Sequence, residues 1–522
     1  MSNSKSALKE LASACRVNVS SKPQSLVAWL ASCSQNTLHV VLLLIALNLV
    51  CYWQTMNGYF LADDFVHVAY LQKVFNGHPH LLLENFWSTW MQTEGTQFYR
   101  PLISLTLAWD FLVSGANATG FHVTNFVFQC LCTIGLFLFA RSISDLKESD
   151  QSRVSVDGSL IAFIAAALFA VHPLHPEVVS WIIARVDSVC CCFYLFAFWL
   201  YIEAIKAQGK RRQMLRILSI TLFAFSLMSK EMAVTLPPAV TLLLIIYPSS
   251  SGAGASEALP SRGFWRRILH AFKQSSWLWL TVIVYLVIRT LALGTLTGGY
   301  QGSIGEGLST TVVQRIFSRE SALRVVFPIN QSQFLVNPGR ACARTCMYVM
   351  AVIYSISAMF LLLRVLFFQL ERKVLLLILF AAVWFVLVMV PAIPVWNLTE
   401  SLQGSRFIYL GTAPLCLLLA AILVPYCGET CMDRDKLQSD SQTPPPGISN
   451  YVPCLTVNAS AGLAAALIAV FAVVAFFNNT SWAHAGAELK CLRQQLDSTV
   501  GRLSNSQALV LLNLPHTYNG AH

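Results

Sequence analysis

Two adjacent carboxylates, Asp63 and Asp64, stand in the apolar segment GYFLADDFVHVAY. Burying two unpaired carboxylates beside aromatic and aliphatic side chains is costly, so the pair needs partners or solvent. Neighbouring side chains in an extended or irregular segment point in different directions. We therefore predict two roles, a general base for one aspartate and a metal or orienting ligand for the other. The alternative is a solvated pair that caps a short helix.

A second polar group lies in the segment AVHPLHPEVVSWIIARVDS. His172, His175 and Glu177 have the ligand chemistry of a divalent metal site, and the two prolines argue against a regular helix there. The alternatives are contacts to a phosphate or sugar, or a turn that ends a helix and carries interfacial histidines. Arg185 and Asp187 follow, and we expect them to form an ion pair at the mouth of the next apolar run.

Three further cations stand at the edges of apolar runs. Arg100 follows Tyr99 in QFYRPL, Lys230 precedes Glu231 in MSKE, and Arg406 lies in SRFIYL. A guanidinium matches a phosphate group with two parallel hydrogen bonds, and an ammonium suits it as a point charge. The alternatives are interface anchors for the two arginines and a local salt bridge between Lys230 and Glu231.

The composition identifies the kind of element that must position these groups. Of the 522 residues 56% are hydrophobic and only 11% are charged, the mean hydropathy is +0.59 and the net charge is +10. These values exclude an ordinary cytosolic enzyme, a disordered protein and a disulfide scaffold. They predict an all-α polytopic membrane protein.

Apolar runs predict about eleven transmembrane helices, although several runs are shorter than the roughly 20 residues of a straight span. The predicted spans are 38–53, 121–140, 159–172, 188–204, 216–228, 233–247, 276–294, 346–363, 374–391, 407–425 and 459–477.

The charge pattern orients these spans. With the N-terminus inside, the basic clusters Lys210–Arg212 and Arg266–Arg267 fall on the cytoplasmic side, as the positive-inside rule expects. All the polar groups described above then fall on the outer side, which predicts one shared site. The predicted segments are a cytoplasmic leader 1–37, a transmembrane domain 38–477 with outer loops 54–120 and 295–345 and an inner linker 426–458, and an outer C-terminal segment 478–522.

In their order and spacing, five segments resemble a known family. ADDF, FYRPL, FHVTN, AVHPLHPEVVSWIIARVDS and MSKE are similar to motifs of the membrane O-mannosyltransferases with tetratricopeptide tails, and more so to their tail-less bacterial relatives. These proteins belong to the GT-C class of integral membrane glycosyltransferases. The resemblance covers roughly residues 40–245 well. No tetratricopeptide repeat follows the last predicted span, and the ending NLPHTYNGAH leads us to expect a truncated chain.

This resemblance implies a GT-C fold, with two outer loops that carry amphipathic helices, and a site at the outer face. It implies transfer of mannose or another hexose from a polyprenyl-phosphate donor to a hydroxyl of a protein or glycan, with inversion by single displacement. Expected partners are that donor, the acceptor and membrane lipids, without nucleic acid. The expected cofactor, where one is used, is Mg²⁺ or Mn²⁺. The expected location is the bacterial inner membrane with a periplasmic site, or the ER membrane in a eukaryote.

The site residues expected from the residues and the resemblance together fall into three groups. Asp63 and Asp64 are the catalytic carboxylates, with Asp63 also the metal ligand. The donor phosphate is assigned to Arg100, Lys230, Arg406 and Arg185. Contacts to substrate or metal are assigned to His172, His175, Glu177, Asp187, Glu231 and Tyr99.

Two other functions compete with this one. The first is a transporter or flippase of lipid-linked sugars, and the second is a non-catalytic scaffold of a glycan assembly complex. Transporters usually hold charged residues near the bilayer midplane and contain paired inverted repeats. The charges in this sequence gather at one predicted surface instead, and the sequence contains no clear repeat.

Overall fold

The computed structural model describes residues 36–93, 97–146, 158–247, 264–295, 319–334, 339–367, 372–424 and 452–500. These residues form helices, turns and irregular segments, and no β-strand occurs among them. The all-α prediction is therefore confirmed over the described part of the chain. The predicted leader 1–37 lies almost entirely outside it, as do residues 501–522.

The elements alternate between long helices and short turns of helix. The first half contains α3 Thr37–Tyr52, η1 Trp53–Asn57, α4 Asp64–Phe75, α5 His80–Glu84, η2 Trp90–Gln92, α6 Pro101–Ser114, α7 Ala118–Ser144, α8 Gly158–Ala170, α9 Pro176–Ser180, η3 Ile182–Ala184, α10 Arg185–Lys206, α11 Gly209–Leu227, η4 Glu231–Thr235 and α12 Leu236–Ile246. The second half contains α13 Phe264–Leu293, α16 Arg319–Val326, η5 Gln331–Phe334, α17 Gly339–Phe367, α18 Arg372–Met389, η6 Val390–Val395, η7 Ser405–Ile408, α19 Tyr409–Leu423 and α21 Val452–Val500.

Eight helices of the described chain are long and apolar enough to cross a membrane, so this is an integral membrane protein. All eleven predicted spans fall on helices, but three of these helices are not among the eight. The helix α8 and the continuous η4–α12 segment are shorter, and α11 carries Lys210, Arg211 and Arg212 in its first turn. The number eleven therefore stays a prediction.

Some predicted boundaries are displaced. The helix α21 already begins at Val452, inside the predicted linker 426–458, and it continues unbroken to Val500 through the start of the predicted outer segment. The helix α17 begins at Gly339, inside the predicted outer loop 295–345. Apolar runs locate the centre of a helix better than its ends, because polar residues continue a helix once it leaves the apolar layer.

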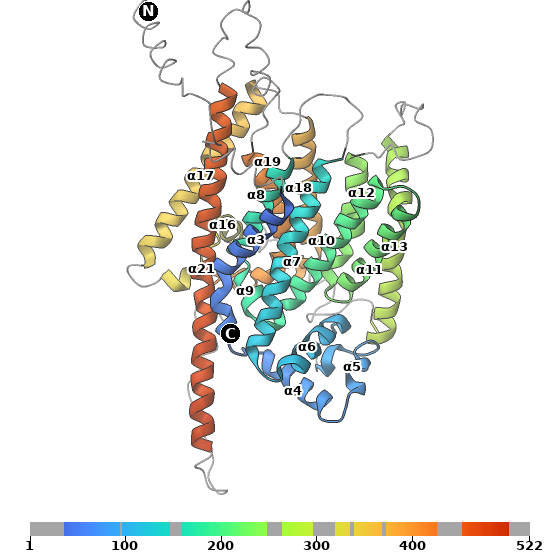
Figure 1. Ribbon diagram of the computed structural model, residues 1–522, viewed down its shortest axis with the longest axis vertical. Helices are drawn as coiled ribbons and strands as arrows, with labels where there is room; N and C mark the ends of the chain where they lie inside the picture. The colour runs from blue at the N-terminus through green and yellow to red at the C-terminus, as the bar shows by residue number, and fades with distance from the viewer. Residues whose placement is uncertain are drawn as a thin grey trace, which may run out of the picture.

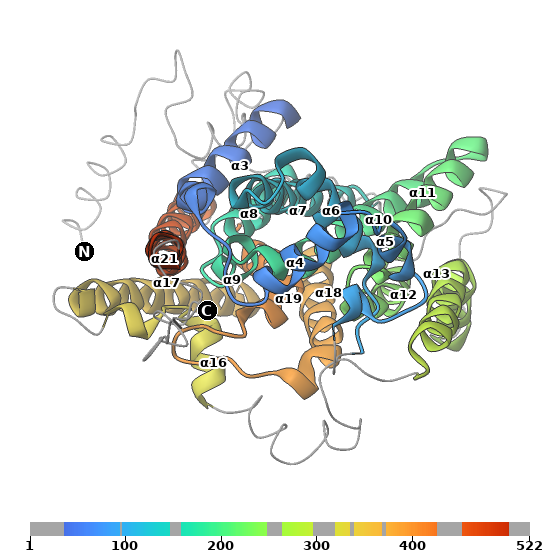
Figure 2. The same ribbon diagram turned by 90° about the horizontal axis from the view of Figure 1, so that it is seen from below.

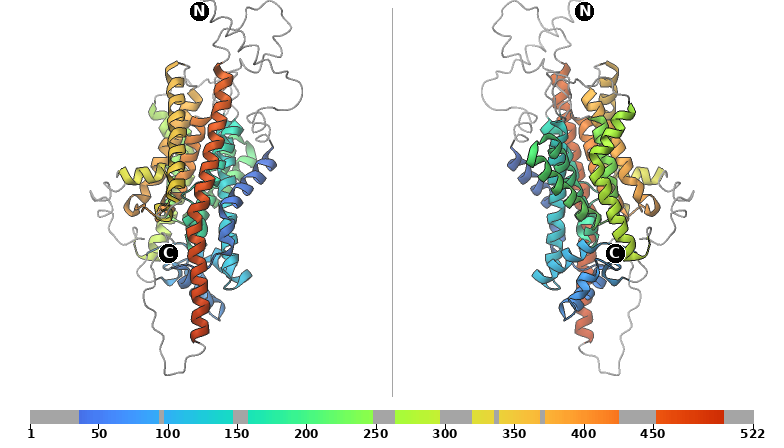
Figure 3. Two further views of the ribbon diagram at one scale, coloured as in Figure 1. Left: turned by 90° about the vertical axis from the view of Figure 1, so that its left-hand side faces the viewer. Right: turned by 90° about the vertical axis from the view of Figure 1, so that its right-hand side faces the viewer.

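The spans form one bundle with a cap of short helices at one end (Figure 1). The helices α7, α8, α10 and α19 supply eight of the twelve largest fully buried side chains of the described residues. Figure 2 shows α4, α5 and α6 lying across the lower end, with α17 and α21 on one side and α13 on the other. Figure 3 shows α21 running along the whole height of the molecule.

Local signals set the helix starts at this lower end. Pro101 occupies the first turn of α6, as predicted, because its fixed φ and missing N–H suit that position. The Asn117 side chain accepts a hydrogen bond from the Thr119 N–H and so caps α7. The turn between α8 and α9 is not helical, as its prolines predicted.

Two adjacent asparagines of α21 join this helix to the lower end of the bundle. Asn478 donates to the Pro173 and Pro328 carbonyl oxygens, each at 2.8 Å. Asn479 accepts from the Ser180 hydroxyl and donates to the Thr55 hydroxyl at 3.1 Å. The bond between Asn479 and Thr55 connects segments that are 424 positions apart in the chain.

We expect Asn479→Ala to lower the free energy of unfolding by about 1–3 kcal/mol, because the Ser180 and Thr55 hydroxyls lose a buried partner. Thermal unfolding in detergent measures this change. Val473→Ala on the exposed side of the same helix serves as the control and should shift the midpoint much less. Equal shifts for the two variants would contradict the assignment.

Candidate functional site

The two adjacent carboxylates lie at the start of α4 in different surroundings. The Asp64 side chain is 1% exposed, and its two oxygens accept the Leu61 and Ile183 N–H groups, each at 2.9 Å. Asp63 is exposed. Asp64 thus ties the loop before α4 to the segment that carries η3, whereas Asp63 is accessible to a ligand.

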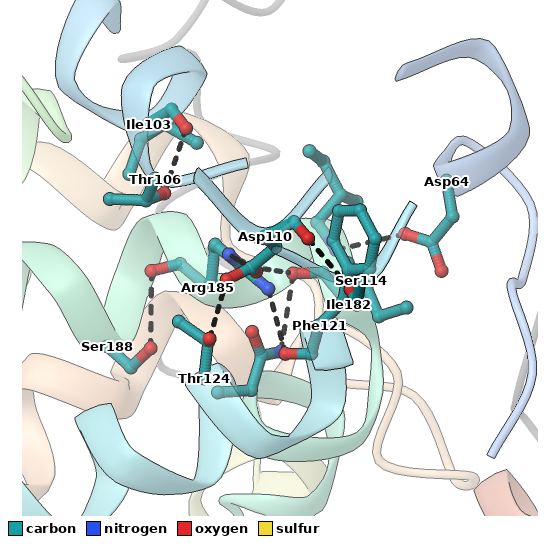
Figure 4. A network of polar contacts seen from close by, with 12 residues as sticks. Asp64, Ile103, Thr106, Asp110, Ser114, Phe121, Thr124, Ile182, Arg185 and Ser188 are labelled. Atoms are coloured by element: carbon teal, nitrogen blue, oxygen red, sulfur yellow. Dashed lines mark hydrogen bonds and ion pairs between the residues drawn. The ribbon is translucent and has the colours of Figure 1, made fainter. Parts of the chain in front are cut away.

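Arg185 forms a buried ion pair, as predicted, but with a different partner from the one the sequence suggested. Arg185 is fully buried, and its guanidinium donates to Asp110 at 2.5 Å and to the Phe121 carbonyl oxygen at 2.8 Å (Figure 4). The other Asp110 oxygen accepts from Thr124 at 2.6 Å. The expected ion pair of Arg185 with Asp187 is therefore wrong. Because Arg185 is enclosed by protein partners, we assign it to holding the scaffold and not to the donor phosphate.

Lys230 and Glu231 do not pair with each other, so the local salt bridge is also wrong. Lys230 donates to Asp187, and Glu231 binds Arg100 at 3.3 Å. Neighbouring residues point apart here because Lys230 has extended backbone just before η4. The turn therefore joins two ion pairs at the lower end of the bundle.

The fourth pair joins Arg406 to Glu177. The Arg406 Nε lies 3.8 Å from a Glu177 oxygen, and its guanidinium carbon lies 4.7 Å from the Trp181 ring and 5.1 Å from the Phe407 ring. The Lys230 ammonium lies 5.2 Å from the same Phe407 ring. Two of the predicted phosphate-binding cations thus lie near the Phe407 ring. The electron-rich face of an aromatic ring attracts cations, so the ring helps to hold both of them.

The Trp181 indole connects this pair to the carboxylate loop. Its N–H donates to the Leu61 carbonyl oxygen at 3.3 Å, three residues before Asp64. A small hollow borders the same region. It is lined by Pro173, Pro176, Glu177, Asn330, Ser401, Leu402, Ser405, Asn478 and Trp482.

The two histidines are buried between α8 and α9 with their rings 5.1 Å apart. His175 is hydrogen-bonded through both ring nitrogens, to Gln129 at 3.4 Å and Thr412 at 2.8 Å. Glu177 accepts from the Ser405 hydroxyl and the Arg406 N–H, both at 3.0 Å. His172 accepts from the Leu174 N–H at 3.3 Å.

These bonds bear on the expected divalent cation. No group of three His, Cys, Asp or Glu side chains suited to a metal occurs within the described ranges. His175 and Glu177 also use their ligand atoms on protein partners. In this arrangement these residues do not fit a metal site, and no step below uses a metal ion. The Mg²⁺ or Mn²⁺ of the sequence analysis stays an untested prediction.

The remaining predicted residue, Tyr99, packs inside the cap. Its hydroxyl donates to the Phe86 carbonyl oxygen at 3.1 Å, and its ring lies 6.1 Å from that of Tyr285. Sequence reasoning missed Asp110 and Arg289, which are both buried. A signal existed for each, since Asp110 is the one charge within the apolar stretch PLISLTLAWDFLVS and Arg289 is a charge within a predicted span.

No protein-family model matches the chain. The chain is 33% identical over 199 residues to the protein O-mannosyl-transferase Tmtc1 of Drosophila melanogaster, which covers 36% of this chain and 21% of that protein. It is 31% identical over 163 residues to human TMTC1, covering 30% and 17%, and 27% identical over 198 residues to mouse TMTC4, covering 36% and 27%. Both are also named protein O-mannosyl-transferases. The chain thus spans less than a third of these relatives' lengths, and this similarity confirms the resemblance that the motifs indicated.

Two solved structures resemble most of the chain distantly. ArnT from Cupriavidus metallidurans, solved with undecaprenyl phosphate, matches with a TM-score of 0.43 and 13% identity over 92% of this chain and 84% of that one. The oligosaccharyltransferase AglB from Archaeoglobus fulgidus, solved with an inhibitory peptide and a dolichol-phosphate, matches with a TM-score of 0.41 and 12% identity over 91% and 61%.

We expect Asp110→Asn to destabilise the protein by about 3–5 kcal/mol, because it leaves the Arg185 charge buried without its counter-ion. Thermal unfolding in detergent and the yield of folded protein report the loss. The matched control is Asp497→Asn, which removes an aspartate from an exposed pair with Arg493 and should leave the midpoint unchanged. An unchanged midpoint for Asp110→Asn would show that Arg185 does not need this partner.

The pKa of Asp64 predicts a pH dependence of stability. Burial raises the pKa of its carboxyl from 3.8 to about 7, against the opposing effect of its two backbone N–H partners and Arg185. Between these two pH values the folded state binds more protons than the unfolded state, so the free energy of unfolding falls as the pH rises. Asp64→Asn should remove this part of the fall in a series of thermal unfolding curves. Identical slopes for wild type and variant would contradict a raised pKa.

Proposed function

We propose that this protein is a membrane glycosyltransferase of the GT-C class that transfers mannose or another hexose from a polyprenyl-phosphate donor to an acceptor hydroxyl. The observation that carries the proposal is the exposed Asp63 beside the buried, backbone-bonded Asp64. The similarity to the protein O-mannosyl-transferases supports the sugar and the reaction class. A protein or glycan hydroxyl at the outer membrane face is the proposed acceptor.

The two aspartates divide the work in this proposal. Asp63 is the general base, because its carboxylate is exposed to an incoming hydroxyl. Asp64 is a positioning residue, since the Leu61 and Ile183 N–H groups hold both of its oxygens. It fixes the loop, and therefore Asp63, relative to η3.

The reaction then follows from the charges around this loop. Asp63 takes the proton of the acceptor hydroxyl, and the oxygen attacks the anomeric carbon on the face opposite the phosphate. The bond to the phosphate oxygen breaks in the same step, so the anomeric centre inverts. Lipid phosphate is a competent leaving group, and the site must mainly stabilise the charge that develops on it.

Lys230 and Arg406 are the proposed phosphate-binding residues, because they lie on one aromatic neighbour, Phe407. Their carboxylate partners Asp187 and Glu177 hold them in place before the donor arrives. Preorganised cations need no reorganisation when negative charge develops, which is the main source of electrostatic catalysis. Arg100 is a third candidate, although it is 4% exposed and bound to Glu231.

We expect Asp63→Asn to reduce sugar transfer by roughly 10²–10⁴-fold, the usual contribution of a general base. The assay incubates detergent-purified protein with radiolabelled polyprenyl-phosphate mannose and other lipid-phosphate hexoses, and it measures release and transfer of the sugar. Asp497→Asn is the control, because it changes the same residue type on the exposed end of α21. Thermal unfolding of each variant separates a loss of activity from a loss of fold.

Full activity of Asp63→Asn would overturn this mechanism, whatever the activity of Asp64→Asn. Absence of turnover with every donor, in folded protein that binds the lipid, would favour a transporter or a scaffold. A liposome flip assay with the labelled lipid then distinguishes those two functions.

A further inference from the structure

Basic side chains gather where α11 and α13 begin. The stretches 207–217 and 264–276 contain no aspartate or glutamate, but the first contains four basic residues and the second contains three. We call these residues the basic patch: Lys210, Arg211, Arg212, Arg216, Arg266, Arg267 and Lys273. The sequence analysis used the two sharpest clusters among them only to orient the spans.

Contacts at the other ends of α11 and α13 fix the level of the patch. The Met228 carbonyl oxygen, directly after α11, accepts from the Leu102 N–H of the cap, and Arg289 of α13 donates to the Gln97 carbonyl oxygen at 3.3 Å. Both helices therefore begin at the end of the bundle opposite the cap. Along α13, Arg267 lies about 33 Å from Arg289 at 1.5 Å per residue, which is close to the thickness of a hydrocarbon core, about 30 Å. The cations of α13 are thus at the headgroup level of the leaflet opposite the candidate site.

The helix α10 joins the two parts of the patch. Its Tyr201 hydroxyl donates to the Gln274 carbonyl oxygen of α13 at 2.9 Å, directly after Lys273. The helix α11 packs along α10 and also contacts α13, at one edge of the bundle (Figure 1). Two helices that are not consecutive in the chain therefore place their cations at the same edge of the molecule.

The cations of the patch have few negative neighbours in the protein. At this end the ion pairs of the described residues belong to Lys206, with Asp145 at 3.7 Å and with Glu203 at 3.1 Å. Arg212 donates from Nε to the Ala207 carbonyl oxygen at 3.0 Å, which does not neutralise its charge. Within the described ranges no cation of the basic patch takes part in an ion pair. Such a cluster of like charges repels itself and attracts an anionic partner.

Exposed apolar side chains continue from the patch toward the cap on both helices. Met214 and Ile217 of α11 are 55% and 64% exposed, and Trp277 and Leu280 of α13 are 60% and 46% exposed. A phospholipid matches both surfaces, because its acyl chains cover the apolar side chains while its phosphate meets the cations. A nucleic acid or an acidic soluble protein would match the cations alone.

We propose that the basic patch binds the headgroups of anionic phospholipids. A guanidinium donates two parallel hydrogen bonds to a phosphate group, and each basic residue near an anionic leaflet adds to the attraction. This goes beyond the positive-inside rule, which concerns the orientation of spans and requires no preference for one lipid over another. An anionic headgroup should be preferred over a zwitterionic one, whose own cation is repelled by the patch.

The proposal requires no sugar transfer, so it stands or falls separately from the proposed function. The patch and the carboxylate loop lie at opposite ends of the bundle. A change in the patch therefore leaves the residues of the candidate site in place.

The test mixes the full chain, purified in detergent, with equal amounts of phosphatidylglycerol and phosphatidylcholine that carry the same acyl chains. Native mass spectrometry measures how much of each lipid stays bound. The variant Arg266→Gln/Arg267→Gln removes two cations of the patch, and Lys490→Gln/Arg493→Gln removes two exposed cations of α21 as the matched control. We expect the wild type and the control to bind severalfold more phosphatidylglycerol than phosphatidylcholine, and the ratio to fall toward one in the patch variant.

A wild type that binds the two lipids equally would overturn the proposal, and so would a patch variant with the wild-type ratio. Glycerol 3-phosphate in excess is added in a further arm. Displacement of phosphatidylglycerol by this soluble phosphate would assign the patch to a soluble anion in place of a lipid and would also overturn the proposal.

A second measurement uses the unmodified chain, since the loss of charges that orient the spans can prevent the variant from folding. Phosphatidylglycerol with a photoreactive group in its headgroup is crosslinked to the wild type, and peptide mass spectrometry locates the adducts. We expect adducts within 207–217 and 264–276. Adducts that avoid both stretches would contradict the proposal.

Discussion

The lower end of the molecule depends on the buried ion pair between Asp110 and Arg185. A charge that is withdrawn from water must meet a counter-ion and further hydrogen-bond partners, and Arg185 also binds the Phe121 carbonyl oxygen. Through this one guanidinium, α6, α7 and α10 are fixed to one another. Asp64 then adds the loop before α4, because it binds the Ile183 N–H two residues before Arg185.

The pairing of charges has a second effect at this end. Lys230, Arg406 and Arg100 each have a carboxylate partner, so the cations are held in place while the local charge is nearly balanced. A site of this kind can stay folded without a ligand at the edge of an apolar layer. It can also bind an incoming anion, because the anion needs only to share cations that are already oriented.

The helix α21 connects this end to the rest of the bundle over a long sequence distance. Asn478 and Asn479 satisfy backbone and hydroxyl groups of three other segments, and such buried amides stabilise one arrangement over others. The turn that carries His175 and Glu177 is thereby held from both sides. Its position relative to the carboxylate loop is fixed by packing and hydrogen bonds together.

The sequence alone determined the class of the protein, the helical nature of every predicted span and the positions where chemistry is possible. These follow from composition, from apolar runs and from local rules such as the proline at the start of α6, which act within a few residues. Only the tertiary structure decided which charges meet. The sequence suggested that Arg185 pairs with Asp187 and Lys230 with Glu231, yet each binds a residue from a distant element. The physical reason is that a buried charge selects the partner that shares its depth and direction, and these are set by helix packing and not by adjacency in the chain.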